Sequence, residues 1–212
     1  DSSTSRGLGD VYKRQGGVSF NSGVSCKMIQ GDRGKISASQ IKPCINSSDF
    51  YHSPRTSLVC LENTTNKGGG AVYNINEIIK ISELCKNEGL ALHLDGARLW
   101  NALELTQENP KVYGSLFDTI SLCFSKGLGC PVGSVLVGSS TKIKEAIRIR
   151  KIFGGGMRQA GYLAAAGSYA LLHHRKDLNN DHRRAKEISE CLNGLNFVKK
   201  AVSYTHLRAH ET

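Results

Sequence analysis

The sequence lacks the features that mark membrane, secreted and repeat proteins. Its most apolar stretch, residues 162–172, is interrupted by Gly167 and Ser168 and is too short to cross a membrane. Residues 1–15 contain no apolar segment of the kind that a secretory signal peptide needs, and no segment recurs along the chain. We therefore expect a protein without membrane spans or internal repeats.

Disulfide and zinc motifs are also missing. The chain has 7 cysteines, an odd number, and no two of them stand at the C-x-x-C spacing. This pattern indicates a reducing compartment, so we predict a cytoplasmic protein that holds no metal. Cys60, Cys85 and Cys123 lie within apolar patterns, and we expect them to fill the core.

Basic residues are plentiful, but no basic run is interleaved with aromatic residues in the manner of many nucleic-acid-binding proteins. The formal net charge is +10. The densest basic stretch, residues 142–158, is either a solvated helix face or a site for an anion such as phosphate. A basic module for nucleic acid stays an alternative, although we expect no nucleic-acid partner.

The length of 212 residues allows one domain, or one large domain with part of a second. Residues 1–15 and 201–212 show no periodicity and have the character of translated vector or adapter sequence. The alternative is that they are native disordered tails. We expect the native part to begin near Gly16 and to be a fragment of a longer protein.

The pattern between these ends predicts alternating strands and helices. Apolar runs bounded by turn residues predict strands, and apolar residues at helical spacing predict helices between them. A strand, a helix and a second strand within this length are typical of a parallel α/β sheet. The expected strands are 57–63, 90–95, 119–124 and 132–137, with a strand-like segment at 26–30; the expected helices are 37–46, 74–88, 99–105, 141–153, 157–174 and 179–192.

One of these strands ends in an unusual way. Residues 119–124 lead directly into Ser125 and Lys126, which are followed by Gly127 and Gly129. Glycines allow a tight turn and the close approach of a flat ligand, and a lysine amine that is shielded from water can attack carbonyl groups. The pattern predicts a nucleophilic Lys126; the alternative is an ordinary surface lysine in a glycine-rich turn.

A second polar residue ends a strand nearby in the sequence. Asp95 closes the strand 90–95 and precedes Lys126 by one strand–helix–strand step. Ligands of open α/β sheets gather at the carboxyl ends of the strands. A lysine that forms a Schiff base and an aspartate that pairs with a pyridine nitrogen are the protein groups that pyridoxal phosphate requires. The alternative for Asp95 is a helix N-cap.

Four motifs then identify a family. They are Leu-Glu-Asn-Thr at 61–64, His-Leu-Asp-Gly-Ala-Arg at 93–98, Ser-Lys-Gly-Leu-Gly at 125–129 and Gly-Gly-Gly-Met-Arg-Gln at 154–159. In this order and spacing the chain resembles the low-specificity L-threonine aldolases, which belong to the β-eliminating lyase group with the aspartate-aminotransferase fold. The resemblance runs from about residue 16 to about residue 197 and is carried by the four motifs together.

The resemblance implies roles for the residues that match these motifs. Lys126 matches the lysine that forms the Schiff base with pyridoxal 5′-phosphate, with Ser125 beside it as a cofactor-binding residue. Asp95 matches the partner of the pyridine nitrogen. Arg98 matches an arginine at the cofactor that also holds the substrate carboxylate, a task suited to a planar bidentate donor.

Three further residues are assigned by the resemblance alone. His52 matches a catalytic histidine near the substrate hydroxyl. Lys151 and Arg158 match residues that reach the cofactor phosphate from a neighbouring subunit, which implies a homo-oligomer. By contrast, His93 is expected to be a hydrogen-bonded histidine in the core or behind the cofactor ring.

The implied fold is a three-layer, mostly parallel sheet with helices on both faces, over residues 16–177, followed by the start of a small domain at 178–200. The implied reaction is cleavage of L-threonine or L-allo-threonine to glycine and acetaldehyde; another pyridoxal-phosphate lyase or an aminotransferase of the same fold is the alternative. Thr65 stands where the family commonly has a histidine. The family's phosphate loop and second carboxylate-binding arginine have no match in the chain, so we expect the chain alone to be inactive.

Overall fold

The computed structural model describes the backbone of residues 11–198 and the side chains of residues 16–198. Most of the expected foreign tails, at 1–15 and 201–212, therefore lies outside the described residues. Residues 11–15 belong to a helix that continues to Ser22. The segment from Gly16 to Gln30 was expected to be poor in helix and to end in a strand at 26–30. Both expectations are wrong: the described chain is helical as far as Ser22, and residues 26–30 form no strand.

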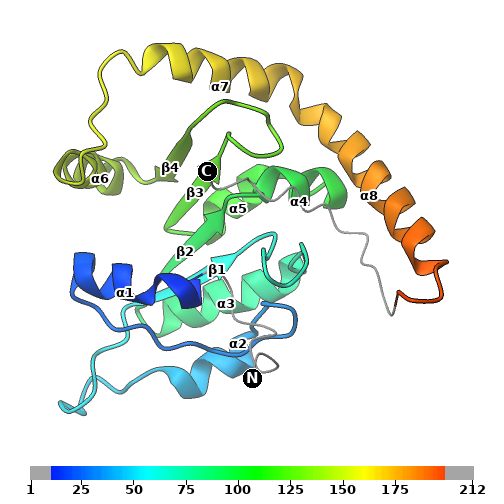
Figure 1. The fold of residues 1–212 in the computed structure, drawn as a ribbon. Coiled ribbons are helices and arrows are strands. Elements are labelled where there is room, and N and C mark those ends of the chain that lie inside the picture. The colour runs from blue at the N-terminus through cyan, green and yellow to red at the C-terminus, as the bar shows by residue number, and fades with distance from the viewer. Residues whose placement is uncertain (1–10, 199–212) are drawn as a thin grey trace.

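The elements alternate along the chain as Figure 1 shows. They are α1 (Val11–Ser22), α2 (Ala38–Ile41), the 3-10 helix η1 (Lys42–Cys44), β1 (Leu58–Glu62), α3 (Ile75–Asn87), β2 (Ala91–Gly96), α4 (Leu99–Thr106), α5 (Pro110–Leu116), β3 (Thr119–Cys123), β4 (Ser134–Gly138), α6 (Ser140–Ile152), α7 (Gly161–His173), the 3-10 helix η2 (Arg175–Asp177) and α8 (Leu178–Asn193).

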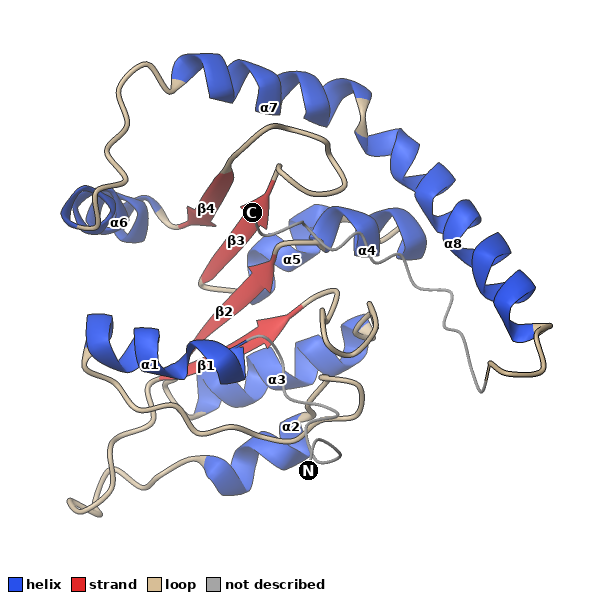
Figure 2. Cartoon of the chain, viewed as in Figure 1, coloured by secondary structure: helices blue, strands red, loops and turns tan. Residues whose placement is uncertain are grey.

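The four strands form one sheet in the order β1-β2-β3-β4 (Figure 2). β1, β2 and β3 are parallel because helices cross over between them, α3 between the first two and α4 with α5 between the next two. β4 is antiparallel to β3 because the loop 124–133 returns the chain without a helix. The predicted mostly parallel α/β sheet is confirmed.

One face of the sheet carries the main core. Leu61, Leu94 and Ile120 point to this face and are at most 5% exposed. They pack with buried residues of α3, α4 and α5, among them Ile78 and Tyr113. The alternation of side chains along each strand and the helical spacing along α3 produce this contact, as the apolar pattern predicts.

Two short helices show how polar residues fix the ends of elements. Ser37 begins α2 with a capping box in which its side chain and that of Gln40 bond reciprocally to the backbone. α5 was not expected from the sequence. Asn109 caps it by accepting from the backbone N–H of Lys111, and Pro110 occupies its first turn, a position that suits proline.

The opposite face of the sheet is more exposed and more polar. It carries Cys60, His93, Asp95 and Cys123 on neighbouring strands, since paired residues of parallel strands share a face. Cys60 is exposed and Cys123 is half-buried, so the expectation that they fill the core is wrong for both. It is confirmed for Cys85, whose burial raises the pKa of its thiol to about 11.

A second, smaller apolar cluster lies beyond the carboxyl end of β3. Its buried members are Leu128, Cys130, Ala170 and Leu178, with Trp100 and Phe124 packed against them. It joins the loop after β3 to α7 and α8. Within the described part of the chain, no helix has the length and apolar character needed to traverse a bilayer.

The alternation along β1 gives a matched test of the core. Leu61 is 3% exposed and Leu58, on the same strand, is 50% exposed. We expect Leu61→Ala to lower the free energy of unfolding by about 2–5 kcal/mol, because it leaves a cavity under α3. We expect Leu58→Ala to change it by less than about 1 kcal/mol. Urea unfolding followed by circular dichroism measures both, and equal losses would contradict this assignment of the two faces.

Candidate active site

The candidate site lies where the three parallel strands end. β1 is followed by Asn63 and Thr64, β2 by Ala97 and Arg98, and β3 by the loop that contains Lys126. Asn63 is fully buried and donates its backbone N–H to the carbonyl of Asp95 at 3.0 Å. The ends of β1 and β2 are thereby tied together, and this edge of the sheet is the one at which ligands of such folds bind.

Asp95 and Lys126 lie on the same face of the sheet. Asp95 pairs with Ser121 in the register of β2 and β3, so its side chain shares a face with those of Ser121 and Cys123. The Nζ of Lys126 donates to the Sγ of Cys123 at 3.2 Å, which turns the amine back over that face. With about 4.8 Å between strands and about 3.3 Å per residue, the Cα atoms of Asp95 and Cys123 are about 8 Å apart.

The turn after β3 is shaped by its glycines. The N–H of Gly129 donates to the carbonyl of Lys126 at 2.9 Å, with a φ of +71° at Gly129 that a residue with a side chain rarely adopts. A Cβ on Gly127 would stand 2.8 Å from a methyl carbon of Leu178 and 3.2 Å from the side-chain oxygen of Asn101. Only glycine fits at position 127 without a shift of its neighbours.

Asp95 takes part in the turn after β2 without capping the next helix. Its Oδ1 accepts from the N–H of Ala97 at 3.1 Å, while the N-cap of α4 is Arg98. The second carboxylate oxygen has no hydrogen bond among the described residues. The helix-cap alternative for Asp95 is therefore wrong, and a carboxylate oxygen is left for a ligand on the exposed face.

Arg98 is a buried cation at this edge. The residue is 7% exposed, and its Nε is buried without a hydrogen-bond partner among the described residues. Thr64 Oγ1 and Trp100 Nε1 are the other buried side-chain atoms of the described part that have no partner. All three belong to the segments that follow β1 and β2. Buried polar atoms are nearly always hydrogen-bonded, so their gathering at one edge indicates a place for a polar, anionic ligand.

These observations fit a group with a carbonyl, a ring nitrogen and a negative charge. Lys126 offers an amine, Asp95 a carboxylate on the same face, and Arg98 a guanidinium that lacks an anion. Thr64 and Trp100 were not expected from the sequence to belong to the site. A buried hydroxyl and indole carry no sequence signal of their own, because only the structure shows that they lack partners.

His93 lies behind Asp95 on the same face of β2. Its Nδ1 is 2.7 Å from the Oγ1 of Thr119 on β3. Burial lowers the pKa of His93 from its usual 6.5, against the opposing influences of Asp95 and Thr119. His93 therefore fits the expectation of a hydrogen-bonded, neutral histidine next to the site.

Three predicted site residues are not brought together with Lys126 in the chain. His52 lies in the exposed loop that enters β1 at its amino end, the edge opposite to Asp95, where it contacts the rings of Phe50 and Tyr51 at 5.5 and 4.0 Å. Lys151 lies in the last turn of α6 and Arg158 in the connection that follows this helix, and both are exposed. Their predicted roles stay predictions. Ser125, also exposed, adjoins Lys126.

Thr65, at the position where the family commonly has a histidine, is fully buried. Its Oγ1 donates to the carbonyl of Arg33 at 2.8 Å. The side chain is enclosed by glycines: a Cβ on Gly34 would lie 3.1 Å from the Cβ of Thr65, and a Cβ on Gly68 would overlap its hydroxyl. Thr65 thus ties together the two loops that carry residues 31–35 and 65–71.

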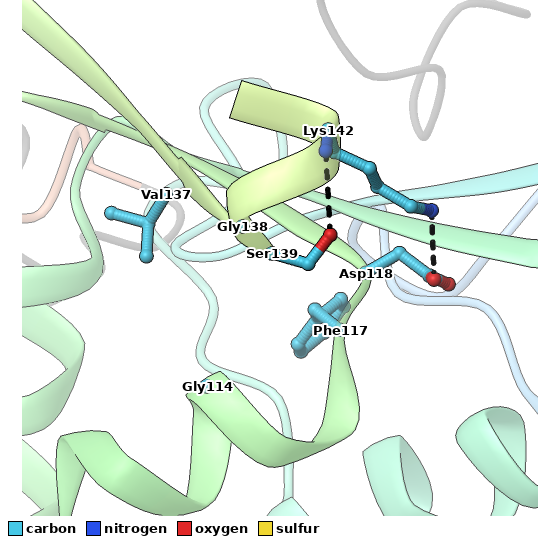
Figure 3. A pocket seen from close by; sticks show the side chains of 7 residues that line it. All are labelled: Gly114, Phe117, Asp118, Val137, Gly138, Ser139 and Lys142. Carbon is cyan, nitrogen blue, oxygen red and sulfur yellow. Dashed lines mark hydrogen bonds and ion pairs between the residues drawn. The ribbon is translucent and has the colours of Figure 1, made fainter. Parts of the chain in front are cut away.

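An open pocket of about 410 Å³ lies elsewhere, at the amino end of β3 (Figure 3). Its polar residues neutralise each other: Lys142 contacts Asp118 at 2.9 Å, and this hydrogen bond is the main cause of the lowered pKa of Asp118. Asp118 also accepts from the N–H of Leu92 at 2.9 Å. These contacts hold the start of β3 to β2 and α6. The charged residues of the pocket therefore have a structural role.

The lowered pKa of His93 makes stability depend on pH. Below the usual pKa of 6.5 the unfolded chain takes up a proton that the folded chain resists, so stability falls as the pH falls. We expect His93→Asn to reduce the loss of stability between about pH 7.5 and pH 5.5. Urea unfolding at both values measures it, with His173→Asn, at an exposed histidine, as the control. An unchanged loss in His93→Asn would contradict the assignment.

Comparison with known proteins adds a family to this geometry. The chain matches the family described as β-eliminating lyase over residues 10–211. It is 39% identical over 197 residues to low-specificity L-threonine aldolase 1 of Arabidopsis thaliana, which covers 91% of this chain and 54% of the relative. It is 42% identical over 176 residues to the low specificity L-threonine aldolase of Escherichia coli K12, with 82% and 50% covered.

A solved structure agrees with the fold. The threonine aldolase of Leishmania major superposes with a TM-score of 0.76 over 87% of this chain and 54% of that chain, at 24% identity. The chain spans about half the length of the curated relatives it matches. The family match covers most of the chain, and the sheet brings Asp95 and Lys126 to one face. The chain therefore belongs to the β-eliminating lyase family.

Proposed function

We propose that the chain binds pyridoxal 5′-phosphate at Lys126 and is part of an enzyme that cleaves L-threonine or L-allo-threonine to glycine and acetaldehyde. The observation that carries the proposal is the joint placement of Asp95, Lys126 and the unpaired Arg98 at one edge of the sheet. The threonine aldolases among the relatives supply the substrate class.

Each of the three residues has a task that its surroundings allow. The Lys126 amine would hold the cofactor covalently and release it when a substrate amine takes its place. Asp95 would pair with the ring nitrogen through its free carboxylate oxygen and keep that nitrogen protonated. When bound, the cofactor supplies an electron-accepting ring for the breaking of the bond between Cα and Cβ of the substrate.

Arg98 would bind the substrate carboxylate. Arg98 is 7% exposed as a residue. A buried guanidinium without an anion is costly, and a carboxylate in a bidentate pair lowers that cost. Fixing the carboxylate also fixes the orientation of the Cα–Cβ bond over the ring. Thr64 and Trp100, with a buried hydroxyl and a buried indole N–H that lack partners, would offer further hydrogen bonds at the same edge.

The remaining predicted roles involve residues outside this constellation. His52 would accept the proton of the substrate hydroxyl, for which its loop would have to approach the site of another subunit or move from the amino edge. Lys151 in the last turn of α6 and Arg158 between α6 and α7, both exposed, would reach the phosphate of a neighbouring subunit in a homo-oligomer. Ser125 would contact the cofactor beside Lys126. A cytoplasmic location accords with the unpaired cysteines.

Cofactor binding is tested on the chain itself. We expect it to take up pyridoxal 5′-phosphate, with a visible absorbance band, and borohydride reduction to fix the label on Lys126, because this amine shares a face of the sheet with Asp95. Lys126→Ala should abolish both signals and Asp95→Asn should weaken binding, whereas Lys111→Ala, at an exposed lysine of α5, should change neither. Peptide mass spectrometry locates the label, and labelling spread evenly over the lysines would contradict the proposal.

The role of Arg98 is tested on the longest open reading frame that contains this chain. We expect Arg98→Lys to raise the KM for L-threonine by about 10- to 100-fold, because a lysine keeps the charge but loses the bidentate contact. Cofactor absorbance should persist. A KM within about twofold of the original would show that Arg98 does not bind the carboxylate.

The products of the same protein distinguish the reaction from its alternative. Glycine and acetaldehyde in equal amounts support the aldolase. A keto acid formed from the amino acid would assign the chain to another lyase or an aminotransferase of the same fold. Either product requires bound cofactor. The product analysis therefore decides the type of reaction, whereas the labelling experiment decides whether the cofactor binds.

A further inference from the structure

The loop that carries Lys126 is held from outside the site by the segment α7–η2–α8. We call residues 124–130 the Lys126 loop. Figure 1 shows α7 and α8 following one another past the end of β3 and past one end of α4. None of the residues of this segment that contact the loop has a predicted role in binding cofactor or substrate.

His174, at the junction of α7 and η2, makes the polar contact. Its Nδ1 lies 2.9 Å from the carbonyl oxygen of Leu128. Because a carbonyl can only accept, Nδ1 carries the proton and donates it. The ring of Tyr169 stands edge-on to the imidazole at 5.4 Å and limits its rotation. The bonded carbonyl is two residues from Lys126.

Leu178, the first residue of α8, makes the apolar contact. It is fully buried in the second apolar cluster together with Leu128 and Cys130 of the loop. Its Cδ2 occupies the space beside Gly127 in which a Cβ would stand. Cys130 adds a weak hydrogen bond from its Sγ to the carbonyl of Ala166 in α7, at 3.6 Å.

The far side of the loop rests on α4, to which α8 is also fixed. The side chain of Asn101 faces Gly127, and the backbone carbonyl of Asn101 accepts from Nε2 of His182 in α8 at 2.9 Å. Asn179 donates to Glu104 at 2.5 Å. Gly127 is therefore enclosed between α4 and α8, and the amine of the neighbouring Lys126 donates to Cys123.

We infer that His174 is a positioning residue for Lys126. Its hydrogen bond to Leu128 holds the Lys126 loop against the second apolar cluster and thereby keeps the amine over the face that carries Asp95. The inference rests on the proposed function for the use of that amine, but the hold on the loop exists without any ligand.

Two substitutions at His174 separate the hydrogen bond from simple packing. His174→Ala removes the donor. His174→Asn restores one, because the side-chain Nδ2 of asparagine is the same number of bonds from the backbone as Nδ1 of histidine. His173→Ala is the matched control, since His173 is exposed and its ring lies 4.3 Å from that of Tyr169, without a hydrogen bond to the loop among the described residues.

The first measurement is amide hydrogen exchange of the chain without cofactor. We expect His174→Ala to speed the exchange of peptides covering the Lys126 loop about tenfold, because the loop loses a hydrogen bond that holds it closed. His174→Asn should restore most of the protection, and His173→Ala should leave it unchanged. Unchanged exchange in His174→Ala would overturn the inference.

The second measurement is the ratio of borohydride-fixed pyridoxal phosphate on Lys126 to that on Lys142, by peptide mass spectrometry. We expect His174→Ala to lower this ratio severalfold, His174→Asn to recover it and His173→Ala to preserve it. Faster exchange with an unchanged ratio would make the contact structural only and would overturn the positioning role. If the original chain shows no preference for Lys126, the proposed function fails, and the exchange result still decides whether His174 holds the loop.

Discussion

The parallel pairing of β2 with β3 in a single register is the constraint on which the candidate site depends. Asp95 stands opposite Ser121 in this register, and Lys126 returns to the same face through its contact with Cys123. Because side chains alternate along a strand, a slip of one residue would turn either group to the helix-covered face. The apolar residues Leu94 and Ile120 oppose such a slip, since it would expose them. The packing of the core thus also fixes the geometry of the chemistry.

Much of this arrangement could be predicted from the sequence because it follows from periodicity. Apolar runs predicted the strands, and their polar ends identified Asp95 and Lys126. α5 was missed because its 7 residues are too few for a helical period to show and include Gly114, although Asn109 followed by Pro110 is a helix start. Cys60 and Cys123 were misassigned because an apolar run does not reveal which of its residues face a covered side of the sheet. The positions of His52, Lys151 and Arg158 relative to the site depend on long connections, which local pattern does not determine.

The structure has two apolar clusters with separate effects on the site. The larger one, under α3, α4 and α5, sets the spacing and register of the strands. The smaller one, around Leu128 and Leu178, fixes the turn that follows β3. Asp95 stands on a strand that the first cluster holds, Lys126 stands in the loop that the second holds, and Trp100 packs against both clusters. The distance between carboxylate and amine therefore depends on how the two clusters are joined through α4.

The buried Thr65 bears on how this family can vary at its active-site rim. The hydroxyl and the two facing glycines leave space for a small side chain alone. An imidazole at position 65 would require the turn at 31–35 and the loop at 65–71 to separate. Residues 34 and 68 are already glycine, and a Cβ on Gly68 would also meet the carbonyl oxygen of Arg33, so no smaller residue at either position could supply that room. The space for a histidine at this rim has to come from the backbone of the two loops.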